Sequence, residues 1–260
     1  MSHNLWATLP CTLDGGLASR AAIGLLALAS DGVIENELRA FLELDGVAVF
    51  VSRIQPIPDT TPASLRMMED GLPDATGRLL PGQPLDVIAF GCTSGAMAIG
   101  AERVAVKINS VPQGVHVTDP VSASLKALAH LGARRVALLT PYADSVNQMV
   151  DAYLAEQELN VAERGSFKQT FETINRISQS DVARAGTELG SRDVDAVFIS
   201  CTGLRCSAVV ESIERATGKP VVTSNQALAW DLLRLAGIDQ PVAGRGRLLA
   251  AHRTVGGQDK

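Results

Sequence analysis

One local pattern occurs twice in the chain, and each copy ends on a thiol. The first copy is LDVIAFGCTSG (residues 85–95) and the second is VDAVFISCTGL (residues 194–204). In both, an aspartate stands six positions before a Cys-Thr pair, which begins at Cys92 in one copy and at Cys201 in the other. Two unrelated packing cysteines have little reason to share the residues that precede and follow them. The repeat therefore predicts a duplicated unit, with one thiol from each copy facing a shared substrate.

Short apolar runs alternate with helical patterns along the rest of the chain. The segments AAIGLLAL, GVAVFVSRI, RRVALLTPY and KPVVTSN have the apolar and β-branched composition of strands. The segments GVIENELRAFLEL, PVSASLKALAHLG and QALAWDLLRLAG have apolar residues at helical spacing. Continuous apolar strands separated by helices are typical of parallel sheets that are covered on both faces. We therefore predict an α/β fold.

The alternation divides into two similar halves that join at the loop SVPQGVHVTDP (residues 110–120). Each half runs through strand, helix, strand, helix and strand to its cysteine, which predicts two pseudo-symmetric, Rossmann-like lobes. The first lobe would comprise residues 1–115 and 225–260, because we expect the last helix to cross back onto it. The second lobe would comprise residues 116–224. We expect the polar tail HRTVGGQDK to be loose.

Composition and charge argue against several classes of protein. Of the 260 residues, 46% are hydrophobic and 20% are charged, which is ordinary for a globular enzyme. A formal net charge of −5 without a clustered run of Lys and Arg gives no electrostatic reason to expect a nucleic-acid partner. The longest apolar run, around AAIGLLALAS, is too short to span a bilayer and does not resemble a signal peptide. We therefore expect a cytoplasmic protein that does not bind membranes.

The other cysteines and the histidines form no disulfide or metal-binding pattern. Four cysteines in a chain of this length do not make a disulfide framework, and none of their spacings is C-x-x-C. We expect Cys206 to lie within the helix that follows Cys201 and to serve packing, and we expect no role for Cys11. The four histidines are scattered along the chain, so we predict no metal site.

The position of the two Cys-Thr pairs predicts their chemistry. In open α/β sheets, ligands bind beyond the carboxyl ends of the strands, which is where both pairs lie. The backbone N–H groups of residues 93–95 and 202–204 would then lie at helix N-termini and favour an anion. The same helix dipole would lower the pKa of a thiol and increase its thiolate fraction. An anion cradle beside a thiolate suits a small carboxylate substrate.

Several motifs resemble those of the aspartate/glutamate racemase superfamily. They are GCTSG, SCTGLR, ALLTPYADSVN and GKPVVTSNQALAWDLLRLAG, and the similarity extends from about Ile23 to Leu249. The branch that the chain resembles contains maleate cis–trans isomerase, arylmalonate decarboxylase and the ectoine-utilisation protein EutA. The resemblance implies two pseudo-symmetric α/β lobes, an active site between them and no cofactor.

The resemblance also implies that Cys92 and Cys201 are the catalytic pair. Racemases of the superfamily use one thiolate to remove the α-proton and the other thiol to protonate the opposite face. Maleate isomerase instead adds a thiolate to the double bond, allows rotation about the resulting single bond, and eliminates. Arylmalonate decarboxylase keeps only the second-lobe cysteine, so the pair argues against simple decarboxylation. Which thiol acts first stays open, because a racemase runs in both directions.

Other matching positions are implied to contact the substrate. Thr93 and Ser94 would bind one carboxylate in the first lobe, and Thr202 and Gly203 would serve the second lobe. Tyr142 ends the run ALLTPY and matches a tyrosine that reaches the substrate in the isomerases. Without the resemblance, Tyr142 would equally well be a residue that closes a strand.

Two departures from the isomerases concern the substrate. Their S-S-N-T after the first strand corresponds here to A-S-D-G, which puts Asp31 where an asparagine contacts a carboxylate. A carboxylate there would repel a dicarboxylate, so Asp31 would bind a substrate ammonium group or tune Cys92; alternatively, it caps the helix that begins near Val33. In KQTFETINRIS, Phe171 falls near an asparagine of the isomerases, which predicts a more apolar pocket. Asn225 would be structural.

These observations predict a cofactor-independent isomerase of the two-cysteine type. We expect a racemase acting on a small carboxylate, an amino-acid derivative that ectoine breakdown would supply. The alternatives are a true maleate cis–trans isomerase, an arylmalonate-type decarboxylase, and a ligand-binding protein that kept the fold without catalysis. We also expect a homo-oligomer, either dimer or tetramer, because symmetric homo-oligomers are common.

Overall fold

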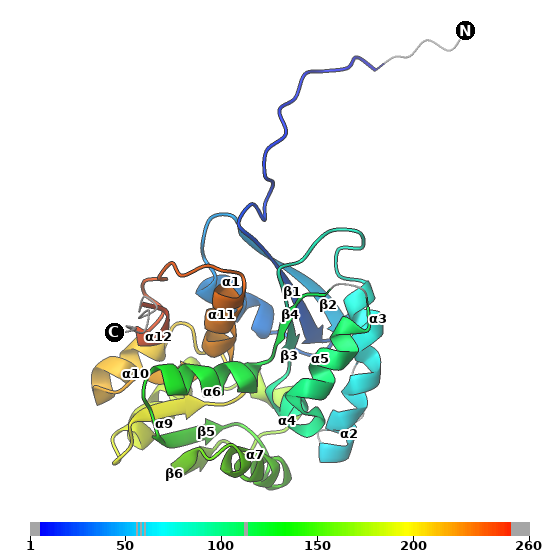
Figure 1. Ribbon diagram of the computed structural model, residues 1–260. Helices are drawn as coiled ribbons and strands as arrows, with labels where there is room; N and C mark the ends of the chain where they lie inside the picture. Colours follow the sequence, from blue (N-terminus) through cyan, green and yellow to red (C-terminus); the bar gives the residue numbers. More distant parts are fainter. Residues whose placement is uncertain (1–5, 56, 58, 60, 112–113, 251–260) are drawn as a thin grey trace, which may run out of the picture.

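The computed structural model describes residues 6–55, 57, 59, 61–111 and 114–250. It contains two four-stranded parallel sheets flanked by helices (Figure 1). The strand order is β2-β1-β3-β4 in the first sheet and β6-β5-β7-β8 in the second. The two sheets therefore have the same topology, in which the second strand along the chain lies at the edge and the first lies beside it. The predicted α/β class with two pseudo-symmetric lobes is confirmed. The C-terminal tail that we expected to be loose lies outside the described residues.

The central strands of both sheets are almost entirely buried, because helices cover both of their faces. This is why their sequences read as continuous apolar runs. The strands of the first sheet are β1 (Ala21–Leu28), β2 (Val47–Ile54), β3 (Val87–Gly91) and β4 (His116–Thr118). Those of the second sheet are β5 (Arg135–Thr140), β6 (Asn160–Ser166), β7 (Ala196–Ile199) and β8 (Val221–Thr223).

The helices follow the strands as the α/β alternation predicts. In the first half they are α1 (Ile34–Phe41), α2 (Pro62–Met67), the 3₁₀ helix η1 (Met68–Gly71), α3 (Leu72–Gly77), α4 (Thr93–Ile99) and α5 (Ala101–Asn109). In the second half they are α6 (Pro120–His130), α7 (Asp144–Glu156), α8 (Phe171–Ile174), α9 (Gln179–Gly190), α10 (Val210–Thr217), α11 (Ser224–Leu235) and α12 (Arg247–Ala250).

The aspartate that precedes each Cys-Thr pair has a structural task, and the task is the same in both lobes. The Asp86 carboxylate accepts a hydrogen bond from the N–H of Ala22, at 2.7 Å. The Asp195 carboxylate accepts from the N–H groups of Arg134 and Arg135, at 2.9 and 2.8 Å. Each aspartate therefore ties the start of one central strand to the start of the next. The duplicated sequence thus corresponds to a duplicated strand pairing.

The change from the first sheet to the second comes later in the chain than the boundary that we placed before residue 116. The segment His116–Thr118 forms β4, which pairs with β3 in the first sheet, and Asp119 then leads into α6. A strand of three partly polar residues has no apolar pattern to reveal it. The last long helix, α11, packs against both α1 and α6 and so contacts elements on both sides of that boundary (Figure 1).

Two further elements differ from the sequence interpretation. Strand β6 was missed, because its sequence NVAERGS is polar and the strand lies at the edge of its sheet. Helix α10 begins only at Val210, so the prediction that Cys206 lies in that helix is wrong. The N–H groups of Cys206 and Ser207 donate to the Glu37 carboxylate of α1, at 2.8 and 2.9 Å. Cys206 is nevertheless buried, as a packing role requires.

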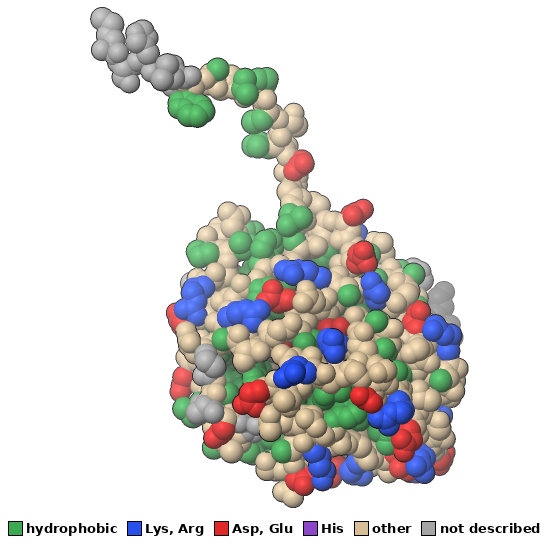
Figure 2. All heavy atoms as spheres, turned by 180° about the vertical axis from the view of Figure 1, so that it is seen from behind, with side chains coloured by type: hydrophobic (Ala, Val, Ile, Leu, Met, Phe, Trp, Pro, Cys, Tyr) green, Lys and Arg blue, Asp and Glu red, His purple; other side chains and the backbone are tan. Residues whose placement is uncertain are grey.

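The surface of the body carries mixed charge on the face seen in Figure 2, where Lys and Arg side chains are interspersed with Asp and Glu. The chain from residue 6 onward extends away from the body before it reaches β1 (Figure 2). Its apolar side chains, among them Leu9 and Leu13, are exposed. No helix in the described part of the chain combines the length and the apolar character that crossing a membrane requires.

Candidate active site

A cavity between the two lobes brings together all eight residues that the sequence singled out as site residues. The first lobe contributes Leu28, Ser30, Asp31, Gly32, Cys92, Thr93 and Ser94. The second lobe contributes Tyr142, Ala143, Val146, Gln169, Phe171, Ile174, Asn175, Cys201, Thr202 and Gly203. The two cysteines follow the central strands β3 and β7, whose carboxyl ends point into the cavity, as expected of ligand sites in α/β sheets.

Cys92 caps the helix α4. Its Sγ accepts a hydrogen bond from the N–H of Gly95, at 3.3 Å, and lies 3.8 Å from the Oγ of Ser94. A side chain at position 95 would place its Cβ 3.0 Å from that sulfur, which is tighter than an ordinary contact. Glycine is therefore needed there to let the backbone approach the thiol.

Cys201 has a similar backbone donor but a different local structure. The N–H of Gly203 donates to its Sγ, at 3.3 Å. The residues after Cys201 form turns up to the start of α10 at Val210, so the expected helix N-terminus at residues 202–204 is absent. The second lobe thus provides a tight turn where the first lobe provides a helix.

Both thiols have raised pKa values, which is opposite to the direction that we expected from a helix dipole. Burial raises the pKa of Cys92 to about 11 and that of Cys201 to about 12. Hydrogen bonds from Gly95 and Ser94 lower the pKa of Cys92, but by less than desolvation raises it. The nearby carboxylate of Asp31 raises both pKa values further. At neutral pH the cavity therefore holds two protonated thiols.

Tyr142 joins the two lobes inside the cavity. It lies just after β5 and is buried, and its hydroxyl hydrogen-bonds the Cys201 thiol, which lowers the pKa of that thiol. Burial, followed by the two thiols, raises the pKa of Tyr142 itself, whereas a hydrogen bond from Ser94 lowers it. The tyrosine is thus a neutral donor at neutral pH, placed between a first-lobe serine and a second-lobe cysteine.

The hydroxyl groups of the two threonines in the expected anion cradle already have acceptors. Thr93 donates to the Oγ of Ser224, at 3.0 Å, and Thr202 donates to the carboxylate of Asp31, at 3.1 Å. Ser94 therefore carries the cradle hydroxyl that lies among the thiols and Tyr142. The structure brings the threonines to the cavity, but their hydroxyls act first in holding the site together.

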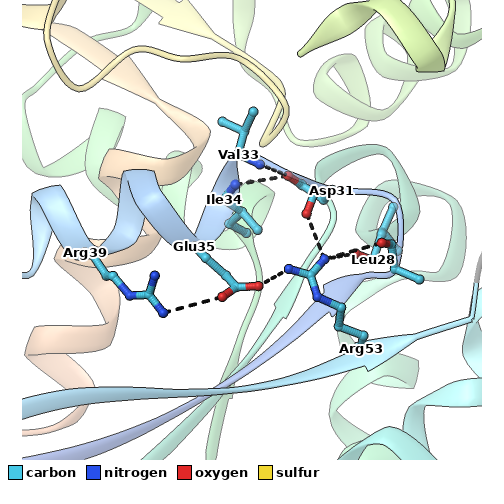
Figure 3. Close-up of polar contacts among 8 residues, drawn as sticks. Leu28, Asp31, Val33, Ile34, Glu35, Arg39 and Arg53 are labelled. Carbon is cyan, nitrogen blue, oxygen red and sulfur yellow. Dashed lines mark hydrogen bonds and ion pairs between the residues drawn. The ribbon is translucent and has the colours of Figure 1, made fainter.

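Asp31 has the capping geometry that was the alternative interpretation, and it also faces the cavity. Its Oδ1 accepts from the N–H groups of Val33 and Ile34, at 2.7 and 3.0 Å, where the chain enters α1 (Figure 3). Its Oδ2 accepts from Thr202 of the other lobe. With both oxygens occupied, Asp31 has less capacity to bind an ammonium group than we expected from the sequence.

The loop after β6 supplies residues that the sequence interpretation missed. We expected an apolar pocket near Phe171, and Phe171 and Ile174 do line it, but the amides of Gln169 and Asn175 line it as well. The irregular loop offers no periodic signal from which their direction could be predicted. Asn225 lies outside the lining, and its Nδ2 donates to the carbonyl of Thr202, at 2.9 Å, in agreement with a structural role.

The described residues that line the cavity include no Lys, Arg or His. A carboxylate ligand would therefore depend on backbone N–H groups, hydroxyls and amides rather than on ion pairs. The described residues also contain no cluster of His, Cys, Asp or Glu able to hold a metal ion. What the cavity does offer is two thiols, one from each lobe, with a tyrosine and two amides around them.

Two repeated parallel-sheet lobes with a cysteine from each at one cavity are the architecture of the aspartate/glutamate racemase-like superfamily. Within it, the chain belongs to the arylmalonate decarboxylase family, whose model matches residues 101–249, and maleate isomerases are among its relatives. The predicted resemblance is therefore confirmed at the level of the family.

The relatives are of two kinds. The chain is 28% identical to the maleate isomerase of Nocardia farcinica over 244 residues, which is 90% of this chain and 97% of that protein. It is 38% identical to the arylmalonate decarboxylase of Bordetella bronchiseptica over 128 residues, which is 48% of this chain and 53% of that enzyme. The match to the decarboxylase thus spans only about half of its length.

Solved structures of both kinds of relative resemble this chain over most of its length. A cysteine-to-serine variant of the Nocardia farcinica maleate cis–trans isomerase, with a covalently bound succinylcysteine intermediate, has a TM-score of 0.81 at 24% identity, covering 88% of this chain and 98% of that one. A doubly substituted arylmalonate decarboxylase in a liganded form has a TM-score of 0.75 at 30% identity, with the same coverage of both chains.

Proposed function

We propose that this protein is a cofactor-independent cis–trans isomerase of a small cis-unsaturated dicarboxylate of the maleate class. The observation that carries the proposal is the pair of thiols, Cys92 and Cys201, which face one cavity from equivalent strand ends of two lobes. The full-length similarity to a maleate isomerase supports this choice within the family.

The first half of the reaction is a conjugate addition. The Cys92 thiolate attacks one alkene carbon and forms an S–C bond, and the π electron pair moves to the neighbouring carbon, where the attached carboxylate delocalises it. The Cys201 thiol then gives its proton to that carbon. The product is a saturated adduct on Cys92 whose central bond is single and free to rotate.

The second half reverses these steps after rotation. The Cys201 thiolate takes a proton back from the same carbon, the electron pair re-forms the double bond, and the S–C bond breaks. Cys92 leaves as a thiolate and Cys201 ends as a thiol, so the pair returns to the singly ionised state that formed when Cys92 lost its proton to solvent, without oxidation or reduction. The carbanion-like transition states gain from hydrogen-bond donors that are already in place, such as the Tyr142 hydroxyl.

We assign the roles of the two cysteines from the local structure around each thiol. Cys92 caps helix α4, where the helix N-terminus and the N–H of Gly95 favour a thiolate, whereas Cys201 lies in a turn and is not at a helix N-terminus. A shared proton therefore resides on Cys201 when one of the two thiols has ionised. This makes Cys92 the nucleophile and Cys201 the general acid and base.

Racemisation of an amino-acid derivative, which the sequence favoured because of Asp31, becomes the second choice. That interpretation needed a carboxylate available for a substrate ammonium group, whereas both Asp31 oxygens accept hydrogen bonds within the protein. A dicarboxylate must therefore gain enough from the donors of the cavity, among them the Ser94 hydroxyl, to offset its repulsion by Asp31. Decarboxylation has the support of a match to half the length of one arylmalonate decarboxylase and of a solved decarboxylase structure covered to 98% at 30% identity, but the pair of thiols argues against it.

The test is an assay with maleate, followed by loss of ultraviolet absorbance and by NMR detection of fumarate. We expect turnover by the native protein and a loss of about 10²–10⁴-fold in Cys201→Ser, since a general acid contributes that much. Cys201→Ser should still form an adduct on Cys92, visible as added mass on the intact protein, and Cys92→Ser should form none. α-Deuteration of amino acids in D₂O, or CO₂ release from arylmalonates, without any fumarate, would replace the proposal by one of its alternatives.

A further inference from the structure

Arg53 holds the wall of the cavity from behind. It lies in the edge strand β2, and its Nη1 donates to the carbonyls of Leu28 and Asp31, at 2.9 and 2.8 Å (Figure 3). Its Nη2 donates to Glu35 in α1. One planar guanidinium therefore bridges both ends of the loop between β1 and α1, which a single-point cation would not do.

That loop presents Asp31 to the opposite lobe. Leu28, Asp31 and Gly32 line the cavity, whereas Arg53 does not. The Asp31 carboxylate accepts the hydroxyl hydrogen of Thr202, the residue next to Cys201, at 3.1 Å, and both groups are buried. The contacts run from the Arg53 guanidinium through the loop backbone to Asp31, and from Asp31 across the lobes to the residue beside the second thiol.

We propose that Arg53 is a positioning residue that keeps the Asp31 carboxylate in the cavity, on Thr202 and facing both thiols. The inference rests on the site of the proposed function, but not on the identity of its substrate. Arg53 acts through the loop, since it touches no residue that would react.

The charged and titratable groups around this arrangement are few. Asp31 acts on both thiols, and Tyr142 and the other thiol face Cys201. Cys206, with Glu37 beside it, interacts with Cys201 and does not line the cavity. On the solvent side, Glu35 contacts Arg53 and also Arg39.

Two possible actions of Arg53 predict opposite shifts in the pH at which the thiols ionise when Arg53 is removed. If Arg53 only contributes positive charge, its removal makes the thiols harder to ionise. If it positions Asp31, its removal lets a negative carboxylate withdraw, and the thiols then ionise at lower pH. Thiol ionisation therefore distinguishes a positioning role from a general electrostatic one.

The experiment measures alkylation of each cysteine by iodoacetamide against pH, with the sites separated by peptide mass spectrometry. The exposed Cys11 serves as the internal reference. We expect Asp31→Asn to shift the profiles of Cys92 and Cys201 to lower pH by about one unit. Arg53→Met and Arg53→Lys should shift them in the same direction, and Arg53→Met should add nothing in the Asp31→Asn background.

Arg164→Met is the matched control. Arg164 lies in β6, the edge strand of the other sheet, and pairs with Asp151 of the neighbouring helix α7, at 2.7 Å. Its carbonyl contact is Val161 in its own strand, so it holds no cavity loop. We expect its removal to leave both thiol profiles in place, and thermal unfolding of every variant shows that the comparison is between folded proteins.

A shift of the Arg53→Met profiles to higher pH, or no shift in either Arg53 variant, would overturn the proposal. So would an additive shift in the double variant, because positioning acts only through Asp31. Alkylation requires no substrate, so a protein that fails to convert maleate still gives a result here. Conversely, if the protein converts maleate but its alkylation profiles do not change in the Arg53 variants, the proposed function stands and the positioning role of Arg53 is wrong.

Discussion

The nucleophile is buried enough that its ionisation should limit the rate at neutral pH. Burial raises the pKa of Cys92 to about 11, and the thiolate is the charged form, so its fraction grows as the pH rises. We expect kcat/KM for maleate to increase about tenfold per pH unit from neutral pH and to level off near the pKa of Cys92. A pH–rate profile measures this, with circular dichroism as the check on folding. A plateau already reached at neutral pH would show that the thiolate forms without this cost.

Tyr142 should matter through the second thiol rather than through the fold. Its hydroxyl hydrogen-bonds Cys201 and lowers the pKa of that thiol, so Tyr142→Phe should raise this pKa further. The lost interaction is worth about 1 kcal/mol, which corresponds to a decrease of about five- to tenfold in kcat. The measurements are kcat, KM and the melting temperature. An unchanged kcat with a lower melting temperature would make Tyr142 a packing residue.

The sequence predicts the residues of the site better than it predicts their contacts. Cys92 and Cys201 are recognisable because the same local pattern surrounds both of them. The bond between Asp31 and Thr202 joins residues 171 positions apart, and no local pattern records such a distance. The sequence also does not show how deeply each thiol is buried. We therefore expected lowered thiol pKa values from a helix dipole, and desolvation reverses the sign.

Helix α6 depends on one buried capping residue. The Asp119 Oδ1 accepts from the N–H groups of Val121 and Ser122, both at 2.9 Å, and its Oδ2 accepts from the Ser122 hydroxyl, at 2.6 Å. We expect Asp119→Ala to lower the free energy of unfolding by about 1–2 kcal/mol and Asp119→Asn, which keeps an acceptor, by less. Urea denaturation measures both. Equal losses in the two variants would mean that the charge of Asp119, and not its capping bond, stabilises the helix.

The regular elements were predictable where their sequence period matches their burial. Strands β1, β3, β5 and β7 are buried on both faces and read as apolar runs, and α1 shows the one-sided apolar spacing of an amphipathic helix. Strand β6 lies at a sheet edge, where a polar sequence is tolerated, so its pattern resembles a loop. The turn that precedes α10 is held by Glu37, which comes from the other lobe and accepts from the N–H groups of Cys206 and Ser207, so no local pattern could predict it.

The two lobes are held together at the site by acidic side chains of the first lobe that reach one segment of the second, residues 201–209. Asp31 contacts Thr202, and Glu37 accepts from the backbone of Cys206 and Ser207 and from the Ser207 hydroxyl, at 2.7 Å. This segment carries Cys201. The position of the second thiol therefore depends on contacts with the first lobe, which explains how two separate sheets form one reaction site.

Removal of Glu37 should weaken the fold and the reaction together. Glu37→Ala leaves the N–H groups of Cys206 and Ser207 without their acceptor, which should cost about 2–4 kcal/mol of unfolding free energy. Because the same bonds fix the segment that carries Cys201, kcat should fall even at temperatures where the variant is fully folded. Glu102→Ala, on the exposed side of α5, is the matched control and should change stability by less than about 0.5 kcal/mol. Urea denaturation and maleate turnover measure the two effects. A destabilised Glu37→Ala with native kcat would mean that Cys201 is positioned by its own lobe alone, through Gly203 and Tyr142.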